Sequence, residues 1–316
     1  MDHELAWIAK ATGARSVERG GRIQSLWSGY GEIFRVELTG IPFASAVVKW
    51  VSPPARRPRG DASSHARKCR SYDVESVWYQ KFADRCGDSC RVAKLYHFER
   101  SGEEWRFLFE DLDAAGYSGR RSVLTPDEID RCLCWLARFH ACFMGMKPEG
   151  LWHTGTYWHL ATRREELDKI VDRELRAAAT LFDRRLNEAK FKTFVHGDAK
   201  IANFCFAPDR GAVAAVDFQY VGGGCGMKDV AYLLSDHPTP HSEADEARHL
   251  DRYFAELRSA LRAPVDVDAL EHEWRELYPI AHADFWRFLA GWAPEEWARD
   301  AHARRAVERA MKQLGG

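Results

Sequence analysis

The sequence predicts an α+β protein of two lobes, and three observations support this class. Short apolar segments separated by glycine-containing turns dominate the first 112 residues, as in an antiparallel sheet. Longer segments with helical spacing of apolar residues fill most of the chain after residue 125. A length of 316 residues, 46% of them hydrophobic, suits two lobes that each have a core. We therefore expect one lobe over residues 1–112 and a mainly helical lobe over residues 113–316.

The composition excludes several classes of protein. A net charge of −1 argues against a nucleic-acid binder, which usually carries a basic excess. No apolar run approaches the roughly 20 residues that a membrane span needs. The first residues, Met1–Glu4, carry acids and no apolar signal core, so we expect no secretion signal. The eight cysteines include no Cys-x-x-Cys pair, so the simplest expectation is reduced thiols in a cytoplasmic protein without a zinc site.

Two strands are expected after a short N-terminal helix. They cover Ile23–Trp27 and Ile33–Leu38 and flank a turn that contains Gly29 and Gly31. In such a turn, backbone N–H groups can approach phosphates because no side chain intervenes. The spacing matches a nucleotide-binding loop of the form G-x-G-x-x-G, except that Phe34 stands at the third glycine position. A plain hairpin turn is the alternative.

A third strand, Ala44–Val51, contains Lys49 among apolar neighbours. A charged group there needs a partner or a wet cavity. A lysine on the third strand of a nucleotide-binding sheet holds the α- and β-phosphates, whereas an edge-strand lysine would face solvent. The helix expected over His65–Phe82 supplies Glu75 as the partner of Lys49, although Asp73 is an alternative.

Two connecting segments interrupt this pattern. Turn formers and charges fill Ser52–Ser64, which predicts a solvated insertion more strongly than an anion-binding one. A second hairpin is expected over Val92–Phe98 and Glu104–Leu112. The following segment, Asp113–Arg121, is rich in small residues and marks the break between the lobes.

Helices are expected through the rest of the chain. A cap, a proline and two acids at Thr125–Glu128 mark the start of a helix that ends near Phe143. His140 on this helix is expected to be a packed histidine rather than a catalyst. Further helical segments are predicted at 161–190, 227–235, 242–261, 267–292 and 295–314.

The most informative stretch precedes and includes a third hairpin. Two apolar runs, Asn203–Phe206 and Ala212–Phe218, flank a Pro-Asp-Arg-Gly turn. Asp198 and Lys200 lie just before the hairpin, and Asp217 lies at the end of its second strand. A loop followed by a hairpin can bring Asp198, Lys200, Asn203 and Asp217 into one space.

These four residue types suit phosphoryl transfer. One carboxylate must accept a proton from a hydroxyl nucleophile, and an amide with a second carboxylate must hold Mg²⁺ against nucleotide phosphates. The spacing matches the pattern H-x-D-x-x-x-x-N followed by Asp-Phe, which predicts Asp198 as the base and Asn203 and Asp217 as metal ligands. Lys200 either offsets charge on the transferred group or is a solvated loop lysine.

The same stretch resembles the aminoglycoside phosphotransferase and choline kinase superfamily, and most closely its ecdysteroid-kinase-like branch of small-molecule kinases. The residues that carry the resemblance are His196-Gly197-Asp198, Asn203, Asp217-Phe218-Gln219 and Gly226–Leu234. It implies a bilobal protein-kinase-like fold, ATP and Mg²⁺ as cofactors, and Asp229 as a structural acid that braces the catalytic loop. It also implies that the backbone at Glu110 and Leu112 reads the adenine edge at the hinge between the lobes.

The sequence therefore predicts an ATP-dependent phosphotransferase that moves the γ-phosphate to a hydroxyl group of a small molecule. An aminoglycoside or choline/amino-alcohol kinase is the alternative within the class, and a non-catalytic nucleotide-binding regulator is the alternative outside it. A protein kinase is disfavoured because no Ser or Thr lies between Asp217 and Asp229. The aromatic residues around Asp284 either line an acceptor pocket that holds a cationic amine or pack as a core. The sequence does not specify the acceptor or the oligomeric state.

Overall fold

A computed structural model describes residues 3–54, 62–208, 211–236 and 242–315, so residues 55–61 of the predicted insertion lie outside the described part. The chain forms two compact units. The first unit comprises Met1–Gly87, Arg91–Gly119 and Cys205–Val216, and the second comprises Asp88–Cys90, Arg120–Phe204 and Asp217–Gly316. The predicted lobe boundary after residue 112 stays a prediction.

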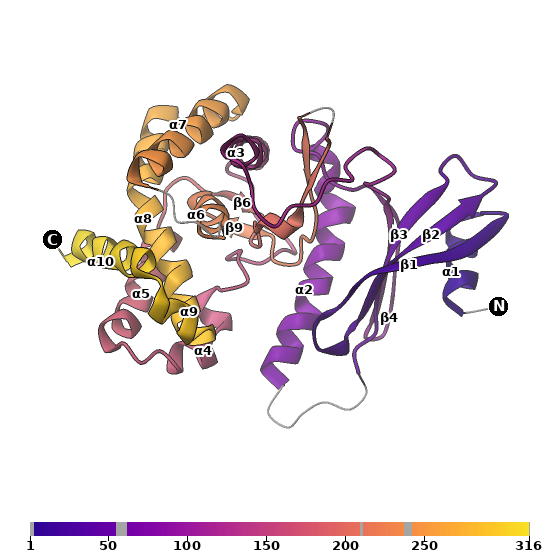
Figure 1. Ribbon diagram of the computed structural model, residues 1–316, viewed down its shortest axis with the longest axis horizontal. Helices are drawn as coiled ribbons and strands as arrows, with labels where there is room; N and C mark the ends of the chain where they lie inside the picture. The colour runs from indigo at the N-terminus through magenta and orange to yellow at the C-terminus, as the bar shows by residue number, and fades with distance from the viewer. Residues whose placement is uncertain (1–2, 55–61, 209–210, 237–241, 316) are drawn as a thin grey trace. The chain divides into compact units, whose positions relative to one another are not determined.

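The first unit is built on an antiparallel sheet with the strand order β1-β2-β3-β5-β4. Its strands are β1 (Ser16–Ser25), β2 (Gly31–Thr39), β3 (Ser45–Val51), β4 (Leu95–Ser101) and β5 (Glu104–Glu110). Figure 1 shows helices α1 (His3–Thr12) and α2 (Ala62–Lys81) on opposite faces of this sheet. The hairpin of β7 (Phe204–Phe206) and β8 (Val213–Ala215) joins this unit through bridges from Phe206 to Gly119 and from Ala215 to Val92.

Strand alternation gives the sheet two different faces. Side chains on successive residues of a strand point to opposite sides. Val48 and Trp50 of β3 therefore pack with Trp7 of α1 in one apolar cluster. Lys49 lies between them in sequence and contacts Glu75 of α2 on the other side of the sheet. The local pattern of β3 thus decides which helix its lysine meets.

The first strand is longer than its sequence suggests. β1 begins at Ser16, seven residues before the predicted start at Ile23, and ends at Ser25 rather than Trp27. Most of its residues are exposed because it forms the edge of the sheet, so no apolar alternation marks it. Trp27 instead begins a 3₁₀ turn, Trp27–Gly29.

The second unit is mainly helical, which together with the sheet of the first unit confirms the α+β class. A long helix, α8, packs against five other helices and is almost fully buried from Ile280 to Gly291. The helices are α3 (Pro126–Cys142), α4 (Arg164–Asp168), α5 (Arg173–Asn187), α6 (Met227–Ser235), α7 (Glu243–Ala260), α8 (Val267–Trp292), α9 (Pro294–Arg299) and α10 (Ala301–Gly315). Short 3₁₀ turns lie at Ala83–Arg85, Leu160–Thr162 and Ile201–Asn203. None of the helices in the described ranges combines the length and hydrophobicity of a transmembrane span.

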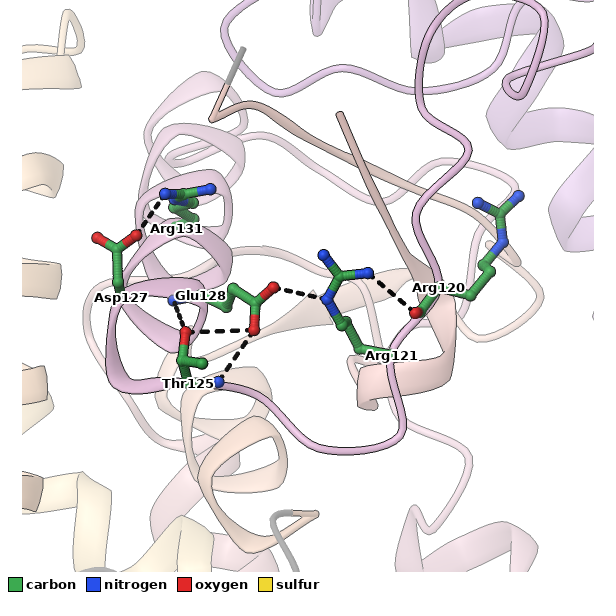
Figure 2. A network of polar contacts seen from close by, with 6 residues as sticks. All are labelled: Arg120, Arg121, Thr125, Asp127, Glu128 and Arg131. Atoms are coloured by element: carbon green, nitrogen blue, oxygen red, sulfur yellow. Dashed lines mark hydrogen bonds and ion pairs between the residues drawn. The ribbon is translucent and has the colours of Figure 1, made fainter. Parts of the chain in front are cut away.

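The start of α3 is fixed by a capping box, as Figure 2 shows. Thr125 Oγ1 accepts a hydrogen bond from the backbone N–H of Glu128 at 3.3 Å, and a carboxylate oxygen of Glu128 accepts one from the backbone N–H of Thr125 at 3.0 Å. Arg121 Nε donates to the other oxygen of Glu128 at 2.6 Å, and Asp127 pairs with Arg131 one turn later. This network satisfies N–H groups that a helix start would otherwise leave unpaired.

Two predictions for the second unit need correction. The segment 295–314 is two helices, because Asp300 leaves helical geometry and its carboxylate accepts from the backbone N–H of Ala303 at the start of α10. No strand was predicted directly after Asp217, but the glycine run there contains one. β9 (Gly222–Gly224) pairs antiparallel with β6 (Thr193–Val195). A Cβ at Gly222 would lie 2.2 Å from the carbonyl oxygen of Trp152, so close backbone packing explains this glycine.

Candidate active site

The loop between β6 and β7 brings three predicted site residues of the second unit together. Asn203 Nδ2 donates to the Oδ2 atom of Asp198 at 3.0 Å and to its backbone carbonyl oxygen at 2.8 Å. Lys200 Nζ lies 3.1 Å from the same Oδ2 atom. The Asp198 side chain is buried, whereas the Lys200 side chain is 32% exposed. Both of these hydrogen bonds are donated by the side-chain nitrogen of Asn203. Its Oδ1 atom can therefore accept a hydrogen bond or bind a metal ion.

Burial sets the acidity of Asp198. Loss of solvent raises the pKa of this carboxyl group to about 6, and the nearby Asp217 carboxylate adds to the increase. Lys200 and Asn203 act in the opposite direction because they stabilise the charged form. The pKa of Lys200 is itself raised: burial lowers it, but Asp198 and Asp217 raise it by more. This loop thus holds one carboxyl group with a pKa close to neutrality.

Asp217 occupies a strained turn directly after the third hairpin. Strand β8 ends at Ala215, so Asp217 lies beyond the strand that was predicted to contain it. Its φ of 70° falls in the left-handed region, which costs a residue other than glycine on the order of 1–3 kcal/mol. Gln219 Nε2 donates to Asp217 Oδ1 at 2.8 Å, and the buried Phe218 packs on the His196 ring with 4.6 Å between centroids. The Gln219 hydrogen bond orients the Asp217 carboxylate, and the Phe218 ring anchors the turn next to it.

Asp229 braces the loop before Asp198. Its two carboxylate oxygens accept from the backbone N–H groups of His196 at 2.6 Å and Gly197 at 2.9 Å. His140 Nε2 lies 3.0 Å from the same carboxylate, and His140 Nδ1 lies 2.7 Å from the Tyr253 hydroxyl. All of these groups are buried. His140 is therefore a packed histidine, as predicted, and it helps to hold the loop.

Gly197 permits the close approach of two loops. Its φ is 80°, and a Cβ there would lie 2.2 Å from the carbonyl oxygen of Tyr220. Only glycine accommodates both conditions. The His-Gly-Asp pattern thus has a steric reason at its central position.

In the first unit, Lys49 and Glu75 form a buried ion pair. Lys49 Nζ donates to the two carboxylate oxygens of Glu75 at 2.9 and 2.7 Å. The alternative partner Asp73 accepts from Trp105 Nε1 at 2.8 Å and pairs with Arg100. The ion pair with Glu75 thus holds the Lys49 side chain on the face of the sheet that α2 covers.

The glycine turn before β2 has two glycines in different surroundings. Gly29 has a φ of 71°, and a Cβ there would meet no atom within 4 Å. Gly31 has a φ of 130°, and a Cβ there would lie 2.0 Å from the carbonyl oxygen of Trp50 on β3. Gly29 therefore permits a tight turn, and Gly31 permits β2 and β3 to pair closely.

The predicted hinge residues, Glu110 and Leu112, are held by hydrogen bonds to other residues of the first unit. The Glu110 carboxylate pairs with Arg91 at 2.5 Å, and the Glu110 backbone N–H donates to the Lys94 carbonyl oxygen at 2.9 Å. The carbonyl oxygen of Leu112 accepts from the Tyr117 N–H at 2.8 Å. Across the described ranges, the Leu112 N–H makes no hydrogen bond, so it is available to a ligand.

Two tyrosines of the second unit, the half-buried Tyr157 and the buried Tyr232, were not predicted as site residues. Burial raises the pKa of Tyr157 and of Tyr232, and the Asp198 carboxylate adds to both increases. Their rings pack at a centroid distance of 5.6 Å. Sequence reasoning had no signal for this pair because they come from separate segments, before α4 and within α6.

Of the two alternatives left open for Asp284, an amine-binding pocket and a packed core, the structure favours the packed core. Its Oδ1 atom accepts from Arg287 Nη2 at 2.6 Å, and its Oδ2 atom accepts from Trp158 Nε1 at 3.2 Å. Asp284 and Arg287 are both buried. The carboxylate therefore already has a cationic partner, and the alternative of a packed core holds.

Comparisons with known proteins place this geometry in context. Among solved structures, a putative fructosamine-3-kinase from Thermobifida fusca is similar with 15% identity and a TM-score of 0.57, over 98% of this chain and 100% of that chain. A microcompartment-associated aminopropanol kinase has 15% identity and a TM-score of 0.54, over 99% and 95% of the two chains. An ethanolamine kinase from Plasmodium vivax has 12% identity and a TM-score of 0.56, over 95% and 82%.

These likenesses concern the fold, which agrees with the predicted bilobal protein-kinase-like class. A search of curated proteins returns no match. The sequence profile of the phosphotransferase enzyme family matches residues 55–264, which is about two thirds of the chain and includes Asp198, Asn203 and Asp217. This chain belongs to the phosphotransferase enzyme family.

Proposed function

We propose that this protein transfers the γ-phosphoryl group of ATP to a hydroxyl group of a small molecule. The observation that carries this proposal is the buried carboxyl group of Asp198, whose pKa is raised to about 6 beside Lys200 and Asn203. Membership of the phosphotransferase family supports the reaction class. The arrangement unites a proton acceptor, a cation and two oxygen ligands, which are the groups that phosphoryl transfer needs.

In this proposal Asp198 accepts the proton of the acceptor hydroxyl. A general base works best when its pKa lies close to the operating pH, and a pKa of about 6 meets this condition. Lys200 stays protonated and offsets negative charge near the transferred group. The Asp229 carboxylate holds the backbone before Asp198, so the base keeps its position during transfer.

Asn203 and Asp217 would hold Mg²⁺. Carboxylate and amide oxygens are the donors that Mg²⁺ prefers, and the Asn203 amide already presents its oxygen because its nitrogen faces Asp198. When bound, Mg²⁺ supplies charge neutralisation to the nucleotide phosphates. Gln219 donates to one Asp217 oxygen and so helps to orient this carboxylate.

The first unit would hold the nucleotide. Lys49, kept charged by Glu75, would contact the α- and β-phosphates, and the turn at Gly29 and Gly31 would cover them. The backbone at Glu110 and Leu112 would read the adenine edge, with the Leu112 N–H as donor.

A second candidate is an amino-alcohol or aminoglycoside kinase. The structural relatives are described as kinases of aminopropanol, ethanolamine and fructosamine, which are small hydroxyl compounds that carry nitrogen. If the acceptor here carries an amine, a group other than Asp284 must bind it, because Arg287 occupies that carboxylate. The aromatic rings of Tyr157 and Tyr232 are candidates for a cation–π contact.

The test is ADP formation from Mg·ATP in the presence of a panel of simple alcohols, amino alcohols, amino sugars and ketosamines. We expect acceptor-dependent ADP formation that is abolished in Asp198→Asn, while ATP affinity measured by calorimetry stays nearly unchanged. Nucleotide binding without turnover on any acceptor would favour the regulator alternative. A folded protein that binds no Mg·ATP would overturn the proposal.

A further inference from the structure

Three side chains with metal-binding chemistry meet at the first turns of α2, within the first unit. His65 and Cys69 are four residues apart and share one face of the helix, and Glu103 reaches them from the turn between β4 and β5. One possible ligand atom from each residue lies within 4.8 Å of the other two. His65 is buried, Cys69 is half-buried and the Glu103 side chain is 59% exposed. Imidazole, thiol and carboxylate thus converge from two elements that are distant in sequence.

The distances within this His65–Cys69–Glu103 cluster are close to those of a coordination sphere. Nε2 of His65 lies 3.5 Å from Glu103 Oε1 and 3.4 Å from the Cys69 sulfur, which also lies 3.6 Å from Nδ1 and so sits over the face of the ring. Tetrahedral zinc, with bonds of about 2.3 Å to sulfur and about 2.0–2.2 Å to nitrogen and oxygen, separates neighbouring ligand atoms by roughly 3.3–3.6 Å. Shared binding of one ion therefore requires the Cys69 side chain to rotate from the ring face towards the Nε2 edge, while Glu103 already lies at a suitable distance.

Tyr30 supports His65 from the opposite side of its ring. The Tyr30 hydroxyl lies 2.7 Å from His65 Nδ1, and both residues are buried. If Nδ1 carries the proton and donates it to the tyrosine oxygen, Nε2 keeps its lone pair for a metal ion. Metal-binding histidines usually make such a hydrogen bond with their second nitrogen, because it fixes the ring and its tautomer. An ordinary histidine–glutamate pair does not require this arrangement or a thiol beside it.

We propose that His65 Nε2, Cys69 Sγ and Glu103 Oε1 bind one divalent cation of the zinc class, with a fourth position for water. Thiolate and imidazole ligands select zinc-class ions over Mg²⁺ and Ca²⁺, which prefer oxygen ligands. The site is thus chemically distinct from the oxygen donors Asn203 and Asp217 of the second unit. We predicted no zinc site from the sequence, because the His-x-x-x-Cys spacing is not a zinc signal by itself and Glu103 is distant in the sequence.

A bound ion would join the start of α2 to the β4–β5 turn. Glu75, the partner of Lys49, lies on the same helix, and Tyr30 lies between the two glycines of the nucleotide-binding turn. Metal binding would therefore restrain both the helix that orients Lys49 and the turn beside it. The consequence is a protein whose melting temperature rises with zinc, independent of nucleotide.

The experiment titrates the nucleotide-free, full-length protein with Co²⁺ and follows its absorption spectrum. We expect one equivalent to bind, with a thiolate-to-cobalt charge-transfer band that Zn²⁺ abolishes by displacement. Cys69→Ser should lose the band. Cys142→Ser is the matched control, because Cys142 is the other half-buried cysteine and lies on α3. It should keep the band.

Two milder variants separate binding from folding. Glu103→Gln changes an exposed side chain and should weaken Co²⁺ binding with the thiolate band retained. Tyr30→Phe removes the hydroxyl group that contacts His65 Nδ1 and should weaken binding by about 10- to 100-fold, as losses of such supporting groups do. A wild-type protein that shows no thiolate band, or a band that survives in Cys69→Ser, would overturn the proposal.

Discussion

The carboxyl group of Asp198 lies in surroundings that oppose its ionisation. It is buried, and a second carboxylate, Asp217, lies close enough to raise its pKa further. Lys200 and Asn203 compensate only in part. A residue held in this way contributes less to folding stability than a solvent-exposed aspartate, and such a conflict is common where a group serves chemistry.

Replacement of Asp198 by Asn should therefore stabilise the protein at neutral pH. The folded pKa of about 6 lies above the unfolded value, so stability from the neutral carboxyl group is complete below the unfolded pKa and is lost as the pH rises through about 6. The variant cannot ionise, so we expect a gain on the order of 1–3 kcal/mol at pH 8 that shrinks towards pH 4. Urea unfolding across this pH range measures the difference.

Asp183→Asn is a control for which we expect a change in stability of the opposite sign. Burial raises the pKa of Asp183, but His159, Lys228 and Arg287 together lower it by more, so the net shift is downward. Its contribution to stability is present above the unfolded pKa and is lost as the pH falls. This variant should lose stability at neutral pH. An Asp198→Asn protein that is less stable than wild type at pH 8 would contradict the raised pKa.

Lys200→Met should raise the pKa of Asp198. The lysine ammonium group stabilises the charged carboxylate at 3.1 Å, and methionine keeps the length of the side chain without the charge. The carboxyl titration is measurable by carbon NMR in metal-free protein, with the Asp198 signal assigned by its absence in Asp198→Asn. An unchanged pKa would show that solvent screens the lysine.

At the scale of elements, the turn before β2 offers a matched pair of glycines. Gly31→Ala places a Cβ 2.0 Å from the backbone oxygen of Trp50, so β2 and β3 must separate locally, and we expect a loss of about 2–3 kcal/mol or more. Gly29→Ala meets open space and should cost only about 1 kcal/mol from its positive φ. If the two variants lose equal amounts of unfolding free energy in urea, β3 must move easily to accommodate the new Cβ.

The link between β3 and α2 can be tested by changing both members of its ion pair. Lys49→Ala alone removes the lysine partner of a buried carboxylate and should destabilise the protein by about 3–5 kcal/mol. Lys49→Met combined with Glu75→Leu should recover most of that stability, because an apolar pair replaces the charged one. Mg·ATP affinity by calorimetry should stay low in the double variant. Normal affinity there would remove the proposed phosphate contact.

Elements with strong local signals were predictable from the sequence. The helices α6 and α8 begin and end at the predicted residues, and the capping box of α3 is visible in Thr125–Glu128. Strand β1 was predicted too short because its edge position needs no apolar face. The strand at Gly222–Gly224 was missed because its glycines reflect packing against Trp152, which is 70 residues away in sequence.

The candidate site shows the same difference between features that are local in sequence and features that depend on distant segments. The spacing from Asp198 to Asn203 brought together residues that are local in sequence, and the structure joins them by hydrogen bonds. The roles of these residues in catalysis stay predictions, as does the assignment to the ecdysteroid-kinase-like branch. The Tyr157–Tyr232 pair and the Asp284–Arg287 pair depend on how separate segments fold together, which residue spacing does not encode.

At the scale of the whole molecule, the first unit is not continuous in sequence. Residues Cys205–Val216 complete it through three backbone hydrogen bonds. Phe206 and Gly119 each donate one to the other's carbonyl oxygen at 2.9 Å, and the Ala215 N–H donates to the Arg91 carbonyl oxygen at 3.0 Å. A fragment of residues 1–119 should therefore unfold at a lower urea concentration than the same fragment with residues 204–216 joined by a glycine–serine linker. Identical unfolding midpoints would show that the hairpin adds nothing to this unit.

Because the chain enters the first unit more than once, segments cannot be exchanged between related proteins at a single junction without separating contacting elements. A chimera made at a single junction, for example to graft a new acceptor specificity from a relative, would combine a sheet from one parent with a hairpin from the other. Three junctions, placed around residues 119, 205 and 216, would be needed to keep the hairpin with its own sheet. Selection for new substrates is then more easily met by point substitution in the helices than by recombination.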